Sequence, residues 1–174
     1  MLIDDTGFIL DPWLRPAPEL PLPSDVPLIL TLDRLKAAGD EPVAQKLGLQ
    51  VPNNTRLAEL LPLFSRLALV SIEFPASGDG RGFSLGKALR DAGYHGELRA
   101  SGRLIADQYA YARGCGFDSV EVPDELAARQ PEAHWKAAAN SLSLSYQRGY
   151  RRGSNILDQR RKARAAAASA AGVE

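Results

Sequence analysis

The sequence predicts an α/β domain whose sheet is mostly parallel. Short apolar runs alternate about five times with segments that repeat apolar residues at helical spacing, and the connections between them are short. The run over 67–74 is almost continuously apolar, which is typical of a strand buried on both faces of a parallel sheet. The chain has 174 residues, whereas a complete eight-unit barrel typically needs ~250. A partial barrel and an open three-layer sheet both fit, with right-handed crossovers and the strand order left open.

Composition divides the chain into three parts. Residues 1–25 hold five of the twelve prolines and a net charge of −4. A short strand over 8–10 is compatible with the sequence, but an extended, poorly packed arm is favoured for this part. Residues 26–147 form the expected single α/β domain. Residues 148–174 are rich in arginine and alanine, carry a net charge of +5 and have no apolar face, so a flexible basic tail is expected.

Capping residues, glycine and proline mark the ends of the elements in the first half of the domain. The apolar run 26–30 is the first strand, and Asp33 begins a helix that Gly39 ends. Residues 47–51 are the second strand. Polar residues at 53–55 can cap the next helix, whose apolar residues recur at helical spacing and which Pro62 kinks or delays.

In the second half, the strand 67–74 is followed by a helix that Ser84 caps and Gly93 stops. Residues 96–102 form a fourth strand, 103–115 a helix, and 116–122 a fifth strand. Pro131 opens a last helix, after which 142–146 is compatible with a sixth strand.

The first candidate site is the glycine-rich loop after strand 67–74, where three glycines bracket Asp79 and Arg81. Ligands of α/β sheets bind at the carboxyl ends of the strands, and an oxyanion of phosphate or sulfite size fits forked arginine donors at a helix start. The anion-binding candidates are therefore Arg81, Ser84 and Arg99, with Asp79 as a candidate catalytic base. The same edge is expected to present Ser101, Arg103 and Glu121.

A structural explanation of the same loop carries equal weight. In that case Asp79 and Arg81 clamp the loop, and Ser84 only caps the helix. The loop also lacks the residues of a phosphate loop, because Arg81 and Ala88 stand where a glycine and a serine or threonine belong. The dinucleotide fingerprint fails at Phe83.

Asp107 and Gln108 are secondary candidates on the helix 103–115, where a solvated face or a helix-to-loop contact is favoured over a site. A single cysteine, Cys115, and two histidines leave no basis for a metal site. No cofactor motif is evident, and no hydrolase motif is present. The chain shows no membrane span and no signal pattern, so a cytoplasmic protein is expected. The basic tail lacks interleaved aromatic residues, which makes nucleic-acid binding an unfavoured function.

Several sequence blocks recur in one ordered pattern. They are Phe74-Pro75, Asp79-Gly-Arg-Gly-Phe-Ser84, Leu89-Arg90, Gly96-Glu-Leu-Arg-Ala100, Gly102, Asp107-Gln108 and Cys115-Gly-Phe-Asp118. In these blocks the chain resembles a bacterial family catalogued as domain of unknown function 934, over about residues 26–147. That family is sometimes described as an oxidoreductase probably involved in sulfite reduction.

The resemblance implies a proteobacterial sulfur-assimilation setting, with genes commonly beside the haemoprotein subunit of sulfite or nitrite reductase. We therefore expect an accessory protein that supports this reductase, by docking to its haemoprotein subunit or by binding a small oxyanion. The alternative is an enzyme, an oxidoreductase or another, that acts on a small phosphorylated or sulfur-oxyanion metabolite with Asp79 as base and the arginines as anion clamp.

Overall fold

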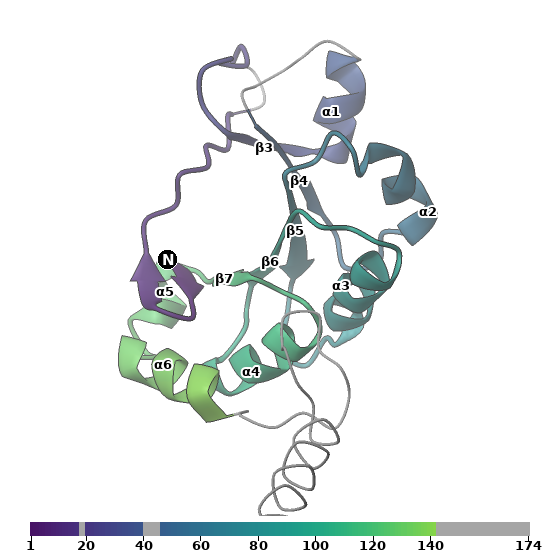
Figure 1. The fold of residues 1–174 in the computed structure, drawn as a ribbon. Coiled ribbons are helices and arrows are strands. Elements are labelled where there is room, and N and C mark those ends of the chain that lie inside the picture. Colours follow the sequence, from purple (N-terminus) through teal and green to yellow (C-terminus); the bar gives the residue numbers. More distant parts are fainter. Residues whose placement is uncertain (18–19, 40–45, 142–174) are drawn as a thin grey trace, which may run out of the picture.

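The strands of the computed structural model, which describes residues 1–17, 20–39 and 46–141, form one seven-stranded sheet in the order β2-β1-β7-β6-β5-β4-β3 (Figure 1). The strands are β1 (Leu2–Asp4), β2 (Gly7–Ile9), β3 (Leu28–Thr31), β4 (Leu47–Val51), β5 (Leu69–Phe74), β6 (Glu97–Gly102) and β7 (Ser119–Glu121). The helices are α1 (Leu32–Ala38), α2 (Leu57–Leu60), the short 3-10 helix η1 (Leu61–Leu63), α3 (Arg81–Asp91), α4 (Ala106–Gly114), α5 (Asp124–Ala127) and α6 (Glu132–Ser141).

The five strands β3 to β7 are parallel and lie side by side in chain order. Successive crossovers of one hand, taken in one direction along a sheet, place all their helices on the same face. In Figure 1, α1 to α4 follow one side of the curved sheet. The fold is therefore a two-layer α/β arrangement with an open sheet, which matches the partial-barrel expectation rather than the three-layer one.

One face of the sheet and the helices enclose the hydrophobic core. Val70, Ile72 and Phe74 of β5 point into it, as do Leu98 and Ala100 of β6. Residues of α1 to α6 cover them, including Leu35, Leu60, Leu89, Tyr109, Ala127 and Trp135. The alternate residues of the same strands point to the opposite face, which we call the helix-free face.

Most elements lie where the sequence predicts them, but β7 is shorter than the expected strand 116–122, α5 was not predicted, and three further differences concern α3, α4 and the N-terminus. Helix α3 begins at Arg81, not at Ser84, because the Asp79 carboxylate accepts the Arg81 backbone N–H at 3.2 Å and the turn is formed three residues earlier. Helix α4 begins at Ala106 rather than at residue 103. The third difference concerns the first nine residues, which the sequence assigned to a poorly packed leader.

These first nine residues form a hairpin that extends the sheet. Strand β1 pairs antiparallel with β7, so that Ile3 lies beside Val120. The Ile3 side chain is 0% exposed and belongs to the core. The hairpin also contacts α6, where Glu132 accepts the Phe8 N–H at the outer edge of β2.

Residues 10–17 and 20–27, which we together call the arm, lie between β2 at one edge of the sheet and β3 at the other. In Figure 1 the arm runs past the side opposite α1 to α4. Leu14 pairs with the outer edge of β3: its N–H donates to Pro27, and its carbonyl accepts the Ile29 N–H, both at 2.9 Å. Arg34 of α1 donates to the arm carbonyls of Pro16, Ala17 and Leu20.

Two sequence predictions fall outside the described residues: the sixth strand over 142–146 and the basic tail over 148–174. Within the described residues, none of the helices has both the length and the apolar character to cross a membrane.

Candidate functional site: the polar face of the sheet

Polar side chains occupy most of the helix-free face of four neighbouring strands. We call this set the polar face; it comprises Gln50, Ser71, Glu73, Glu97, Arg99, Ser101, Ser119 and Glu121. Successive members within β5, β6 and β7 are two positions apart, which places them on one side of the sheet. The polar face is thus a direct product of period-two patterning in β5, β6 and β7.

Strand register arranges the polar face in rows. One row crosses four strands as Gln50, Ser71, Arg99 and Ser119. The next row, nearer the carboxyl ends of the strands, contains Glu73, Ser101 and Glu121. Register partners on adjacent parallel strands lie about 4.8 Å apart, so Glu73 and Glu121 are about 10 Å apart across Ser101. Ligands of parallel sheets bind at this edge.

Arg99 is the centre of the polar face and is 1% exposed. Its guanidinium contacts three carboxylates: Asp11 of the arm at 2.7 Å, Glu97 at 3.3 Å and Glu121 at 3.5 Å. Burial alone lowers the pKa of Arg99, but the hydrogen bond to Asp11 and the charges of the carboxylates raise it above its ordinary value. Arg99 is therefore a permanent buried cation held by carboxylates.

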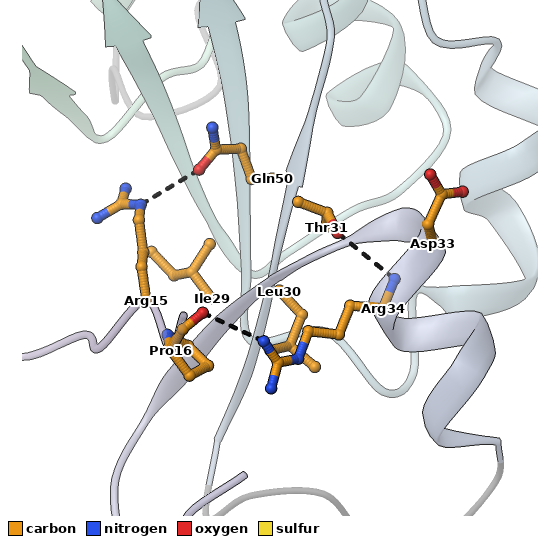
Figure 2. Close-up of a pocket in the computed structure, with 8 residues that line it drawn as sticks. All are labelled: Arg15, Pro16, Ile29, Leu30, Thr31, Asp33, Arg34 and Gln50. Atoms are coloured by element: carbon orange, nitrogen blue, oxygen red, sulfur yellow. Dashed lines mark hydrogen bonds between the residues drawn. The ribbon is translucent and has the colours of Figure 1, made fainter. Parts of the chain in front are cut away.

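The arm supplies a second arginine to the polar face. Arg15 donates to the Gln50 side-chain oxygen at 3.2 Å and pairs with Glu121. Gln50 in turn donates to Glu73 at 2.6 Å. Figure 2 shows Arg15 and Gln50 at one wall of a cavity of about 400 Å³, with Arg34 and Thr31 at the opposite wall.

Two buried polar atoms of the polar face have no hydrogen-bond partner among the described residues. They are the Ser71 hydroxyl oxygen and Arg99 Nε. Ser71 is 0% exposed, and the two residues are register partners on β5 and β6. Buried polar atoms are usually satisfied, so this pair marks a position where a further polar group fits.

The glycine-rich loop is a separate feature at the carboxyl edge of the sheet. Arg81 donates from Nε and Nη2 to the two Asp79 oxygens at 3.0 and 2.6 Å. These bonds hold the pKa of Asp79 far below its ordinary value and raise the pKa of Arg81. A carboxylate with so low a pKa is a poor general base. The pair has the geometry of a loop clamp.

The predicted anion-binding residues are not brought together by any described contact. Arg81 remains with Asp79, and its side chain is 63% exposed. Ser84 is an exposed residue within α3, which packs on the helix-covered face. Arg99 points to the other face, so the sheet separates it from α3.

The secondary candidates have different surroundings. Gln108 accepts the Ile105 N–H and donates to the Ser77 carbonyl at 2.7 Å, which joins α4 to the glycine-rich loop. Its neighbour Asp107 is exposed. This is the helix-to-loop contact that the sequence favoured for the pair. The part of the chain that the structure describes contains no group of three or more acidic, histidine or cysteine residues that could hold a metal ion.

Sequence reasoning identified Arg99, Ser101 and Glu121 at this end of the sheet but missed the other members of the polar face. The available signal was the spacing of Ser71 and Glu73 inside the apolar run 67–74. Two polar residues at positions i and i+2 indicate one polar face, whereas the run was interpreted as apolar on both faces. No local signal pointed to Asp11 and Arg15, whose partners on β6 and β7 are 88 and 106 residues away.

Several residues of the recurring sequence blocks serve the architecture. Arg90 donates to the carbonyls of Tyr94, Gly96 and Gly116 and pairs with Asp118 at 2.8 Å, which ties α3 to the loops before β6 and β7. A Cβ at Gly102 would lie 2.3 Å from the Phe74 carbonyl oxygen, and its φ of 130° favours glycine. The recurrence of these blocks can therefore reflect the packing of the fold as well as a functional site.

Comparison with known proteins gives one positive result. Residues 48–156 match the family described as bacterial protein of unknown function (DUF934), and this match covers more than half of the chain. No curated protein and no solved structure matches. The matched region contains β4 except its first residue, β5 to β7 and the glycine-rich loop, and it includes all eight members of the polar face. The chain belongs to the DUF934 family of bacterial proteins.

Proposed function

We propose that this protein is a cytoplasmic accessory of assimilatory sulfite reduction that docks onto the haemoprotein subunit of sulfite or nitrite reductase. The setting comes from the family resemblance of the sequence blocks. The docking mode rests on one structural observation, the exposed and internally fixed glycine-rich loop at 75–80. In this proposal the protein carries no cofactor of its own.

The loop has the properties of a preformed contact surface. Its residues Pro75 to Gly78 are exposed and have small side chains, so a partner can approach the main chain closely. The loop is held from within by the Asp79–Arg81 pair and from α4 by Gln108. A segment that is already ordered loses little conformational entropy when it binds, and this favours association.

The same contacts weigh against the other modes. An oxyanion on Arg81 must compete with the Asp79 carboxylate, which is already bound through two hydrogen bonds. The enzyme alternative, an oxidoreductase or another enzyme of small phosphorylated or sulfur-oxyanion metabolites, requires Asp79 as a base, which its lowered pKa disfavours. Docking, by contrast, requires neither a free Arg81 guanidinium nor a basic Asp79 carboxylate.

The test is co-purification of the reductase with the tagged protein, using a bulky side chain to block the loop. A Cβ at Gly78 meets no atom within 4 Å, so Gly78→Arg should preserve the fold and obstruct the exposed surface. We expect the recovered reductase to fall at least about tenfold, because a buried, unpaired arginine in an interface is costly.

Gly114→Arg is the matched control, since Gly114 is also exposed, has the same open surroundings and lies at the end of α4. It should recover as much reductase as the parent protein. The proposal is wrong if the parent protein recovers no reductase and a deletion strain keeps normal reductase activity. Equal losses in the two glycine variants would contradict the role of the loop.

A further inference from the structure

The polar face carries more negative than positive charge. Together with the arm residues Asp11 and Arg15 that contact it, the polar face has the four carboxylates of Asp11, Glu73, Glu97 and Glu121 and the two guanidinium groups of Arg15 and Arg99, a net charge of −2. Three of the carboxylates contact an arginine. An excess of charge in a half-buried position is unfavourable unless a counter-charge arrives.

Glu73 is the carboxylate without such a partner. It is half-buried at the carboxyl end of β5, and its one hydrogen-bond donor among the described residues is the neutral Gln50 amide at 2.6 Å. No cation of the described chain lies within ion-pair distance of it. One oxygen of Glu73 is thus available to a donor that reaches the polar face.

The two unpartnered buried atoms lie next to Glu73. Ser71 precedes it by two positions on the same face of β5, and Arg99 is the register partner of Ser71. Two residues along a strand span about 6.6 Å, so the three groups lie within the span of one small molecule. Ser71 can donate or accept, whereas Arg99 Nε can only donate and requires an acceptor oxygen.

The polar face is flanked by open space on two sides. The cavity of about 400 Å³ reaches it at Gln50 (Figure 2). A second cavity, of about 270 Å³, reaches it at Ser101 and Glu121. An anion has little to gain here, because the terminal nitrogens of Arg99 already contact carboxylates.

We propose that the polar face binds a small molecule that carries an ammonium group and, a few bonds away, an oxygen that accepts a hydrogen bond. The ammonium group pairs with Glu73 and contacts the Ser71 hydroxyl. The oxygen accepts the Arg99 Nε–H. This site is independent of the docking loop and can be tested without the reductase.

Three probes of similar size separate charge from shape: ethanolamine, ethylene glycol and glycolate. We expect ethanolamine to shift the NMR signals of the Gln50 side-chain amide and of the Ser101 and Glu121 backbone amides, with saturation at millimolar concentration. Ethylene glycol should bind more weakly because it lacks the charge, and glycolate should not bind. Binding of glycolate as tight as that of ethanolamine, or no saturation by any probe, overturns the proposal.

Glu73→Gln should weaken ethanolamine binding at least about tenfold, because it removes a charge-assisted hydrogen bond and keeps the shape. Asp107→Asn removes the same charge from an exposed position on α4 and should bind like the parent protein. Unchanged binding by Glu73→Gln contradicts the site.

Ser71→Ala provides a second test that does not depend on the folding of the Glu73 variant. Removing an unpartnered buried hydroxyl should raise the melting temperature, while the loss of a ligand contact should weaken ethanolamine binding. A purely structural hydroxyl would leave ethanolamine binding unchanged, and that result would count against the proposal.

Discussion

Arg99 and Arg103 show how four residues of separation change the role of the same side chain. Arg99 is buried and touches three carboxylates, whereas Arg103 is 64% exposed and lies 3.7 Å from an equally exposed Glu125. Water screens the second interaction and not the first. Arg99 lies inside β6, whereas Arg103 follows the end of that strand at Gly102, and this difference in position decides which of the two side chains is buried.

Arg99→Met should therefore lower the free energy of unfolding by about 3–5 kcal/mol, because it leaves three half-buried carboxylates without their shared cation. Arg103→Met should change it by less than about 1 kcal/mol. Urea unfolding followed by circular dichroism measures both values. Similar small losses in the two variants would mean that the carboxylates of the polar face need no buried cation.

Among the elements, the hairpin of β1 and β2 departs most from expectation. Its composition is acidic, and a proline-rich segment follows it, which is typical of an unpacked leader. The pairing of β1 with β7 places Ile3 in the core, although 117 residues separate it from its register partner Val120. Such a distant partner leaves no trace in local sequence patterns.

Ile3→Ala tests whether the hairpin contributes to the stability of the core. We expect a loss of about 2–5 kcal/mol in the free energy of unfolding, because the substitution leaves a cavity beneath the sheet. Leu10→Ala, at a side chain that is 94% exposed just after β2, should have almost no effect. Chemical denaturation of the two variants compares them directly, and a negligible effect at both positions would support an unpacked leader.

Strands and helices that depend on local patterns were predicted well. Residues 47–51 form β4 as expected, and Gly39 ends α1 with a positive φ of 68°. Strand order could not be predicted, because a right-handed crossover can lead to a neighbouring strand on either side. The site was predicted only in part. The sequence placed Arg81 and Ser84 beside Arg99 at the carboxyl edge of the sheet. In the structure Arg81 pairs with Asp79, Ser84 lies on α3, and Arg99 is on the opposite face of the sheet.

At the scale of the whole molecule, two buried tyrosines make the free energy of unfolding depend on pH in the alkaline range. Burial raises the pKa of Tyr94 and of Tyr109 above the ordinary value of 10.0, and the hydrogen bond from Tyr109 to Asp5 at 2.9 Å raises the latter further. The folded state thus holds these protons more tightly than the unfolded state. The stability from this source is complete below about pH 10 and is lost as the pH rises.

Tyr109→Phe should consequently lose less stability than the parent protein between about pH 9 and pH 12. Urea midpoints measured across this range give the two slopes. Tyr111→Phe, at a side chain that is 60% exposed, should change the slope less than Tyr109→Phe does, because burial is only a secondary cause of the raised pKa of Tyr111. A Tyr109→Phe slope equal to the parent's would show that Tyr109 ionises as easily when folded as when unfolded.

The pairing of Leu14 with β3 also affects how the molecule meets its own copies. An uncovered edge strand presents main-chain N–H and carbonyl groups that can recruit another strand and begin aggregation. Here the Leu14 carbonyl of the arm accepts the Ile29 N–H at one edge of the sheet, and the Glu132 carboxylate accepts the Phe8 N–H at the other. The proline-rich segment that appeared to be an appendage thus helps to keep a seven-stranded open sheet from growing into a larger one.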